Sequence, residues 1–136
     1  MRTLVRGSLK NIQSVFILFI VELSYFSLFA RLDPEGHHDG VMLAAAIGVS
    51  EGAVPNKDVF TQYGPLTPLL QGYWLFLTEP TLLSLRIFTA IQLSLCGALL
   101  FWLLRPILTV PYSAAISLAW SLSYPFFILP IDLPWS

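Results

Sequence analysis

Residues 87–104 read IFTAIQLSLCGALLFWLL, an uncharged stretch whose length decides the fold class. At about 1.5 Å of rise per residue, a helix of this length nearly crosses a hydrocarbon core about 30 Å thick. Residues 106–131 are also uncharged, and Arg105 with Pro106 separates the two stretches. Proline suits the first turn of a helix, so we expect a tight hairpin there. The sequence therefore predicts membrane-spanning helices over 83–104 and 107–129.

A third apolar stretch, residues 12–30, lies near the N-terminus and is interrupted by Glu22. The chain before it is basic, with Arg2, Arg6 and Lys10 and no acidic residue. The stretch exceeds the usual apolar core of a signal peptide, and residues 28–31 lack a small-x-small cleavage pattern. We therefore expect a retained spanning helix over 12–30 with a cytoplasmic N-terminus.

The composition of the 136 residues supports this class, since 56% are hydrophobic, only 11% are charged and the mean hydropathy is +0.74. A soluble domain of this size could not cover so much apolar surface. With a net charge of −1, the chain also lacks the basic field of a nucleic-acid binder. The single cysteine, Cys96, excludes an intrachain disulfide and is expected to be a small packing residue.

The polar residues gather between the first two spans. Residues 31–63 carry a local charge of −3, which fits the non-cytoplasmic side, so we expect residues 31–82 to lie outside. Residues 39–51 have a helical apolar face, ended by Gly52 and Pro55. Residues 64–78 carry a helical apolar stripe but are too short to span comfortably. Both segments are predicted as interfacial helices.

The predicted fold is therefore an all-α integral membrane protein with three spanning and two interfacial helices. If 64–78 lies in the interface, Arg105 is cytoplasmic, as the positive-inside rule prefers. We expect residues 1–136 to be a single N-terminal membrane region of a longer polytopic protein of the bacterial inner or plasma membrane. The surrounding lipid is its first expected partner, and no nucleic acid is expected.

The most unusual local sequence holds His37, His38 and Asp39 just outside the first span, at a predicted helix start. Imidazole and carboxylate groups are the ones that proton transfer or a divalent metal would use. The metal candidates are His38 and Asp39. The alternative is a solvated loop in which Asp39 or a histidine caps the helix.

Three further polar positions, Lys57, Asp58 and Tyr63, precede the Gly64-Pro65 dipeptide. Lys57 could meet an anionic headgroup or phosphate, whereas the alternative is a simple turn into the next helix. Glu22 and Arg86 are the charges within the apolar segments. Ionisable groups at such depth are candidates for function, although Glu22 could hydrogen-bond a neighbouring helix and Arg86 could snorkel to the boundary.

The order of these features resembles the N-terminal part of the GT-C-type membrane glycosyltransferases, which include protein O-mannosyltransferases and aminoarabinose transferases. The resemblance covers roughly residues 10–130. In both, a basic start and a spanning helix lead to an acidic residue, a glycine, a second acid, a Tyr-Gly-Pro sequence and an arginine. The matching residues here are Asp39, Ala46, Gly52, Asp58, Tyr63, Gly64, Pro65 and Arg86.

The resemblance implies a polytopic enzyme that transfers a sugar from a polyprenyl-phosphate-linked donor, on the non-cytoplasmic face, to an acceptor. It implies that Asp39 is the catalytic base, orients the acceptor or contacts a divalent metal in members that bind one. Asp58 takes a supporting position, and His37, His38, Lys57, Tyr63 and Arg86 are further substrate-binding candidates. Many members carry an Asp-Glu pair, whereas Gly40 follows Asp39 here. Members also have more helices, so we expect the isolated chain to be inactive.

Two other functions remain open. One is a small non-enzymatic membrane protein or subunit that packs against larger membrane partners. The other is part of a transporter with Glu22 and Arg86 on the substrate path, although no pair of broken helices supports it. The reading frame beyond codon 136 separates these functions, because further hydrophobic segments and another outer loop would favour the enzyme.

Overall fold

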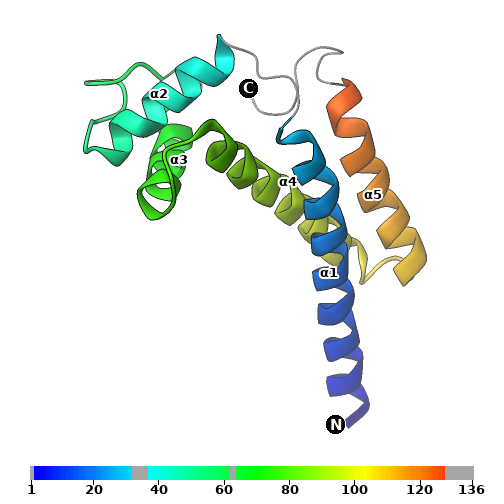
Figure 1. The fold of residues 1–136 in the computed structure, drawn as a ribbon. Coiled ribbons are helices and arrows are strands. Elements are labelled where there is room, and N and C mark those ends of the chain that lie inside the picture. Colours follow the sequence, from blue (N-terminus) through cyan, green and yellow to red (C-terminus); the bar gives the residue numbers. More distant parts are fainter. Residues whose placement is uncertain (1, 32–36, 62–63, 128–136) are drawn as a thin grey trace.

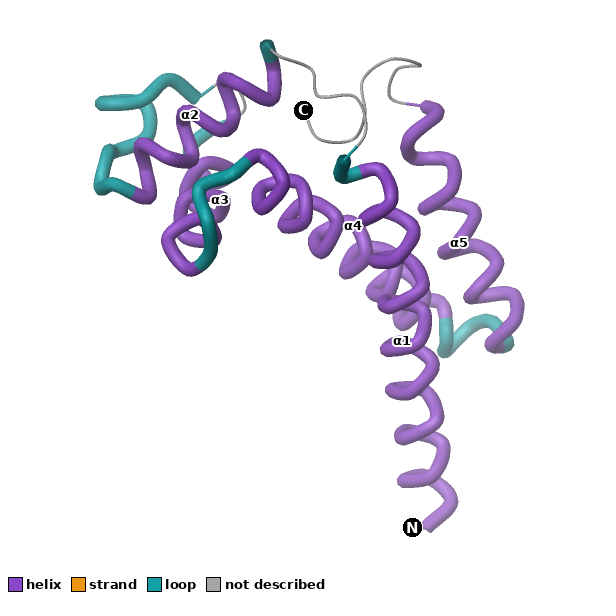
Figure 2. Tube along the Cα trace, in the orientation of Figure 1, coloured by secondary structure: helices purple, strands orange, loops and turns teal. Residues whose placement is uncertain are grey.

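The computed structural model describes residues 2–31, 37–61 and 64–127, and gives only the backbone for residues 2–11, 38 and 124–127. All elements in this part of the chain are helices, as Figures 1 and 2 show, which confirms the all-α class. They are α1 (Arg2–Phe29), α2 (His38–Ser50), α3 (Leu66–Leu77), α4 (Leu82–Leu104) and α5 (Val110–Phe127).

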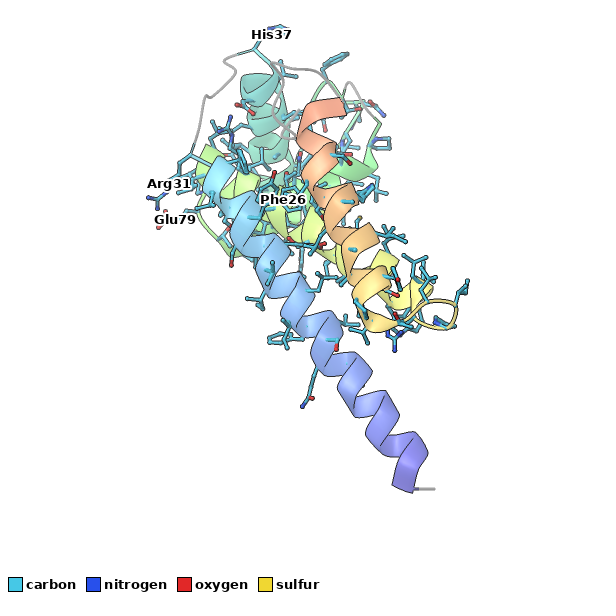
Figure 3. The ribbon with its side chains drawn as sticks, turned by 90° about the vertical axis from the view of Figure 1, so that its right-hand side faces the viewer. Phe26, Arg31, His37 and Glu79 are labelled. Atoms are coloured by element: carbon cyan, nitrogen blue, oxygen red, sulfur yellow. The ribbon has the colours of Figure 1, made fainter. Side chains whose placement is uncertain are left out.

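Three long helices, α1, α4 and α5, form the body of the protein (Figure 1). α4 packs between the other two, and the chain reverses direction from each of these helices to the next. Their shared core contains Phe26 of α1 and Ala30 just after this helix, with Ala90 and Leu93 of α4. Figure 3 shows Phe26 in the interior between the helices, where it is fully buried. The apolar residues of the predicted spans therefore supply the core of this bundle.

Two of these helices are long and apolar enough to cross a membrane: α1 over Ile12–Phe29 and α4 over Leu82–Leu104. The third predicted span corresponds to α5, which starts at Val110, later than expected, because the turn after α4 continues to Leu108. Helix α5 contains serines, tyrosines and prolines, and its described residues are not among the candidate spans. Spanning by α5 therefore stays a prediction.

The short helices α2 and α3 lie together at the end of the bundle where α1 ends and α4 begins (Figure 1). Ala46 of α2, Leu75 of α3 and Leu85 of α4 form a second core cluster. Gly72 of α3 allows close approach, because a Cβ there would lie only 2.6 Å from Cγ1 of Val49. The predicted apolar face of α2 is thus confirmed as a packing face.

The apolar stripe of α3 faces the other way. Its buried residues are Pro68, Gln71, Gly72 and Leu75. The exposed ones are Leu66, Leu69, Leu70, Tyr73, Phe76 and Leu77. Trp74 belongs to neither group, because its indole N–H donates to Ser84 at 3.0 Å and its ring stacks on Phe88. The helix therefore contacts α2 through a narrow face and leaves a broad apolar surface uncovered.

Candidate functional site

An ion pair between Asp39 and Arg86 joins the two ends of the predicted outer segment. Asp39 lies in the first turn of α2, and Arg86 lies near the start of α4. A guanidinium nitrogen, Nη2, donates to Oδ2 of Asp39 at 2.5 Å. Nη1 of the same guanidinium donates to the backbone carbonyl of Ala30 at 3.3 Å, just past the end of α1. One arginine therefore connects α1, α2 and α4.

The pair is buried, since Asp39 is 4% and Arg86 is 3% exposed. The expectation that Arg86 could snorkel to the membrane boundary is therefore wrong. Its guanidinium finds a carboxylate and a helix-end carbonyl inside the protein, and charge-assisted hydrogen bonds of this kind are the strong ones. Asp39 also lies at the N-terminal end of α2, where the helix dipole favours a negative charge.

The two histidines directly precede Asp39 in the sequence. His37 precedes α2 as its N-cap residue, is exposed and makes no capping hydrogen bond with its side chain. Figure 3 places it at the tip of the molecule, away from Phe26 and the bundle interior. The side chain of His38 lies outside the described residues. Among described residues, no group of three or more acidic, histidine or cysteine side chains could hold a metal.

The other predicted site residues do not join Asp39. Lys57 and Asp58 are exposed in the connection after α2, at the end of that helix opposite to Asp39 (Figure 1). Oδ2 of Asp58 accepts the backbone N–H of Val54 at 3.0 Å, so this carboxylate closes the turn. Tyr63 lies outside the described residues. The structure thus brings together Asp39 and Arg86 and separates them from the Lys57–Asp58 turn.

Sequence reasoning missed the contact that positions α3 beside the ion pair. The indole N–H of Trp74 donates to both the hydroxyl and the carbonyl of Ser84 at 3.0 Å. The hydroxyls of Thr78 and Ser84 are also 2.7 Å apart. Thr81 caps α4 by accepting the N–H of Ser84. These bonds fix the start of α4, one turn before Arg86.

Cys96 is another departure from expectation, because the structure places it on the exposed surface of α4 rather than in a packed interior.

Comparison with protein-family models, with curated proteins and with solved structures finds no match to this chain.

Proposed function

We propose that this chain is part of a membrane glycosyltransferase that takes a sugar from a polyprenyl-phosphate-linked donor on the non-cytoplasmic side. The observation that carries the proposal is the buried pair of Asp39 and Arg86 at the α2–α3 end of the bundle. Charged residues within apolar segments are expensive and usually functional. This pair lies where the short helices α2 and α3 meet the end of α1 and the start of α4, the two candidate spans.

The proposed chemistry requires a group that orients a hydroxyl and accepts its proton. The acceptor oxygen forms a bond to the anomeric carbon of the sugar, while the bond from that carbon to the phosphate oxygen breaks. The polyprenyl phosphate leaves with the electron pair, and the acceptor proton goes to a base. A carboxylate offers about four lone-pair positions, so Asp39 can accept hydrogen bonds besides that of Arg86. Arg86 then acts as a positioning residue for Asp39.

A metal remains a hypothesis for this site. Asp39 and His38 are adjacent in sequence, and carboxylate and imidazole groups bind divalent metals. Arg86 already occupies one oxygen of Asp39, which favours the orienting role over metal binding. The proposed site therefore uses the carboxylate without assigning it a metal.

The proposed membrane setting rests on the outward face of α3. Helices that lie in an interface turn an apolar face toward the acyl chains, with aromatic residues at headgroup level. Leu66, Tyr73 and Phe76 are each at least 66% exposed within the protein. This surface would rest on the outer leaflet, with α2 between α3 and water. A lipid-linked donor could then reach the Asp39 end of α2 from the membrane.

The proposed role of Asp39 predicts that Asp39→Asn abolishes sugar transfer. The experiment uses membranes containing the complete reading frame, a polyprenyl-phosphate-linked sugar and mass-spectrometric detection of the product. Asparagine keeps the shape of the side chain and an oxygen that accepts from Arg86, so insertion should be retained. We expect a rate loss of at least about 100-fold, within the usual contribution of a general base.

The matched control is Asp58→Asn, the same change in the exposed turn, which should retain most of the transfer. Near-normal transfer by a well-inserted Asp39→Asn protein would contradict the proposed role. Equal losses in both variants would show that the assay reports a general loss of acidic charge outside the membrane.

The proposed orientation predicts that a cysteine at position 57 reacts from outside the cell. The test places Lys57→Cys in a Cys96→Ser background and adds a membrane-impermeant maleimide to intact cells. Lys57 is exposed in the α2–α3 connection, whereas Ile107 is 80% exposed in the turn at the other end of the bundle (Figure 1). Ile107→Cys should therefore label only after permeabilisation, and the reverse pattern would invert the topology.

A second candidate function is a non-enzymatic membrane subunit. It is favoured by the low exposure of Asp39, because an acceptor could contact a 4% exposed residue only if the surrounding helices move. In this case the ion pair ties three helices together and has no substrate. Retained transfer by Asp39→Asn, together with lost binding of a membrane partner when Arg86 is replaced, would favour this function.

A further inference from the structure

Glu22 lies at the point where three helices meet. It comes from the middle of the apolar part of α1 and is 1% exposed. Its Oε1 lies within hydrogen-bond distance of two hydroxyls of α5, that of Ser117 at 3.0 Å and that of Ser121 at 2.8 Å. The α4 residue beside it is Gly97, where a Cβ would come within 1.9 Å of Oε2. Both faces of the carboxyl group are therefore enclosed by protein.

The two serine hydroxyls have too few hydrogens to donate in every short contact that they make with Glu22 and Gly97. The hydroxyl of Ser117 is also 2.7 Å from the backbone carbonyl of Gly97. A carbonyl can only accept, so this short contact uses the one hydrogen of Ser117. The 3.0 Å contact between Ser117 and Glu22 then needs a hydrogen from the carboxyl group. An ionised carboxylate has none to give.

The surroundings also give a negative charge no partner. In the described parts of α4 and α5 the only charged side chain within a helix is Arg86, which is about three turns from Gly97 and paired with Asp39. Oε2 of Glu22 accepts no hydrogen bond from any described residue. The other titratable groups with described side chains on α1, α4 and α5 are Tyr25, whose ring contacts Phe26 and Phe29, and the exposed Cys96 and Tyr112.

We propose that Glu22 is a neutral carboxylic acid that donates its proton to Ser117 and so completes a hydrogen-bond chain across α5, α1 and α4. Ser121 donates to Glu22, Glu22 donates to Ser117, and Ser117 donates to the carbonyl of Gly97. Each contact then has one hydrogen. Oε2 becomes the carbonyl oxygen of the acid, which is far less costly to leave unpaired than half of a carboxylate.

In this site a protonated carboxylic acid of α1 links α4 and α5 through hydrogen bonds. The site is independent of the proposed sugar transfer. Polar bonds between helices in lipid fix which helices meet and in what register, because apolar contacts discriminate little there. Glycine at position 97 lets α4 approach the acid closely. The proton is therefore a structural component of the bundle, bound between Glu22 and Ser117.

The test is infrared difference spectroscopy of the protein in lipid bilayers at neutral pH, with carbon-13 in the glutamate carboxyl groups of a parallel sample. The spectrum of the wild type minus Glu22→Gln should contain the carbonyl stretch of a protonated carboxylic acid, and the label should shift this band. Glutamine is close to the acid in size, and its NH₂ group can donate to Ser117 as the proposed acid does. A difference spectrum with only carboxylate bands would overturn the proposal.

A second pair of variants tests the chain itself and serves if Glu22→Gln does not fold. Ser117→Ala removes the acceptor of the acid proton and should shift the labelled carbonyl band. Ser123→Ala is the matched control, because Ser123 also lies on α5 but donates to the carbonyl of Trp120 at 2.9 Å. A band that is absent from the wild type, or unmoved by Ser117→Ala, would contradict the proposed chain.

Discussion

Leucine at position 86 should lower the free energy of unfolding by about 3–5 kcal/mol, the usual cost of removing one partner from a buried ion pair. The variant leaves the carboxylate of Asp39 in a site where that residue is 4% exposed. It also takes a donor away from the carbonyl of Ala30. The measurement is denaturant unfolding of the purified protein in detergent micelles, followed by tryptophan fluorescence.

The double variant Asp39→Leu with Arg86→Leu should recover most of this loss. Two apolar side chains of similar size need no counter-ion, and such replacements are often neutral or stabilising. Arg31→Leu is the control for loss of a positive charge, because Arg31 is exposed and its replacement should change stability by less than about 0.5 kcal/mol. If the losses of unfolding free energy in Arg86→Leu and Asp39→Leu add in the double variant, the two residues are not coupled. The proposal that this ion pair connects α1, α2 and α4 is then wrong.

The sequence identified both Asp39 and Arg86 as candidate site residues, but it did not predict that they form an ion pair. Asp39 was predicted from its place after the first span, and Arg86 as a charge within the second. They are 47 residues apart, and nothing local sets which face of α2 meets α4. The glycine at 72 and the bond from Trp74 to Ser84 decide that docking, and both act through space. The expectation that Arg86 snorkels was therefore wrong, because the partner of its guanidinium is set by tertiary packing that the sequence does not reveal.

Helix existence followed from length and apolar pattern, because each of the five predicted helical segments corresponds to a helix in the described residues. The direction of an apolar face did not follow. The stripe on α3 predicted an interfacial helix but not the face that meets the rest of the protein, and the structure packs α3 through Gly72 and Leu75. Cys96 shows the same limit of periodicity, since it was expected inside and is exposed. In an apolar helix, periodicity cannot tell a protein neighbour from lipid.

The environment of Glu22 could be predicted in part from the sequence and in part only from the packing of the helices. Its depth in an apolar run marked it as unusual, and the spacing of Ser113, Ser117 and Ser121 by four places them on one face of α5. The burial of Ser117 and Ser121 against Glu22 depends on the arrangement of three helices. The Asp39 site and the Glu22 site are thus separate features at different depths of one bundle.

Alanine at position 72 should separate α2 from α3, although alanine is the better helix former. In an open helix, Gly→Ala gains about 1 kcal/mol. At Gly72 the new Cβ would lie 2.6 Å from Cγ1 and 2.8 Å from Cβ of Val49, and 3.0 Å from the carbonyl oxygen of Ala46. A backbone oxygen and a β-carbon cannot rotate away, so the helices must move apart. Overpacking of this kind costs about 1–3 kcal/mol.

Gly40→Ala provides the matched comparison within α2, because no atom lies within 4 Å of its added Cβ and its backbone is helical. It should stabilise the protein or leave it unchanged, so the two Gly→Ala variants should move the unfolding midpoint in opposite directions. Gly72→Ala should also raise hydrogen exchange in α2, whose core residue Ala46 packs on Leu75. If both substitutions stabilise equally, α2 does not dock on α3 through Gly72, and Asp39 is not held against Arg86 by that packing.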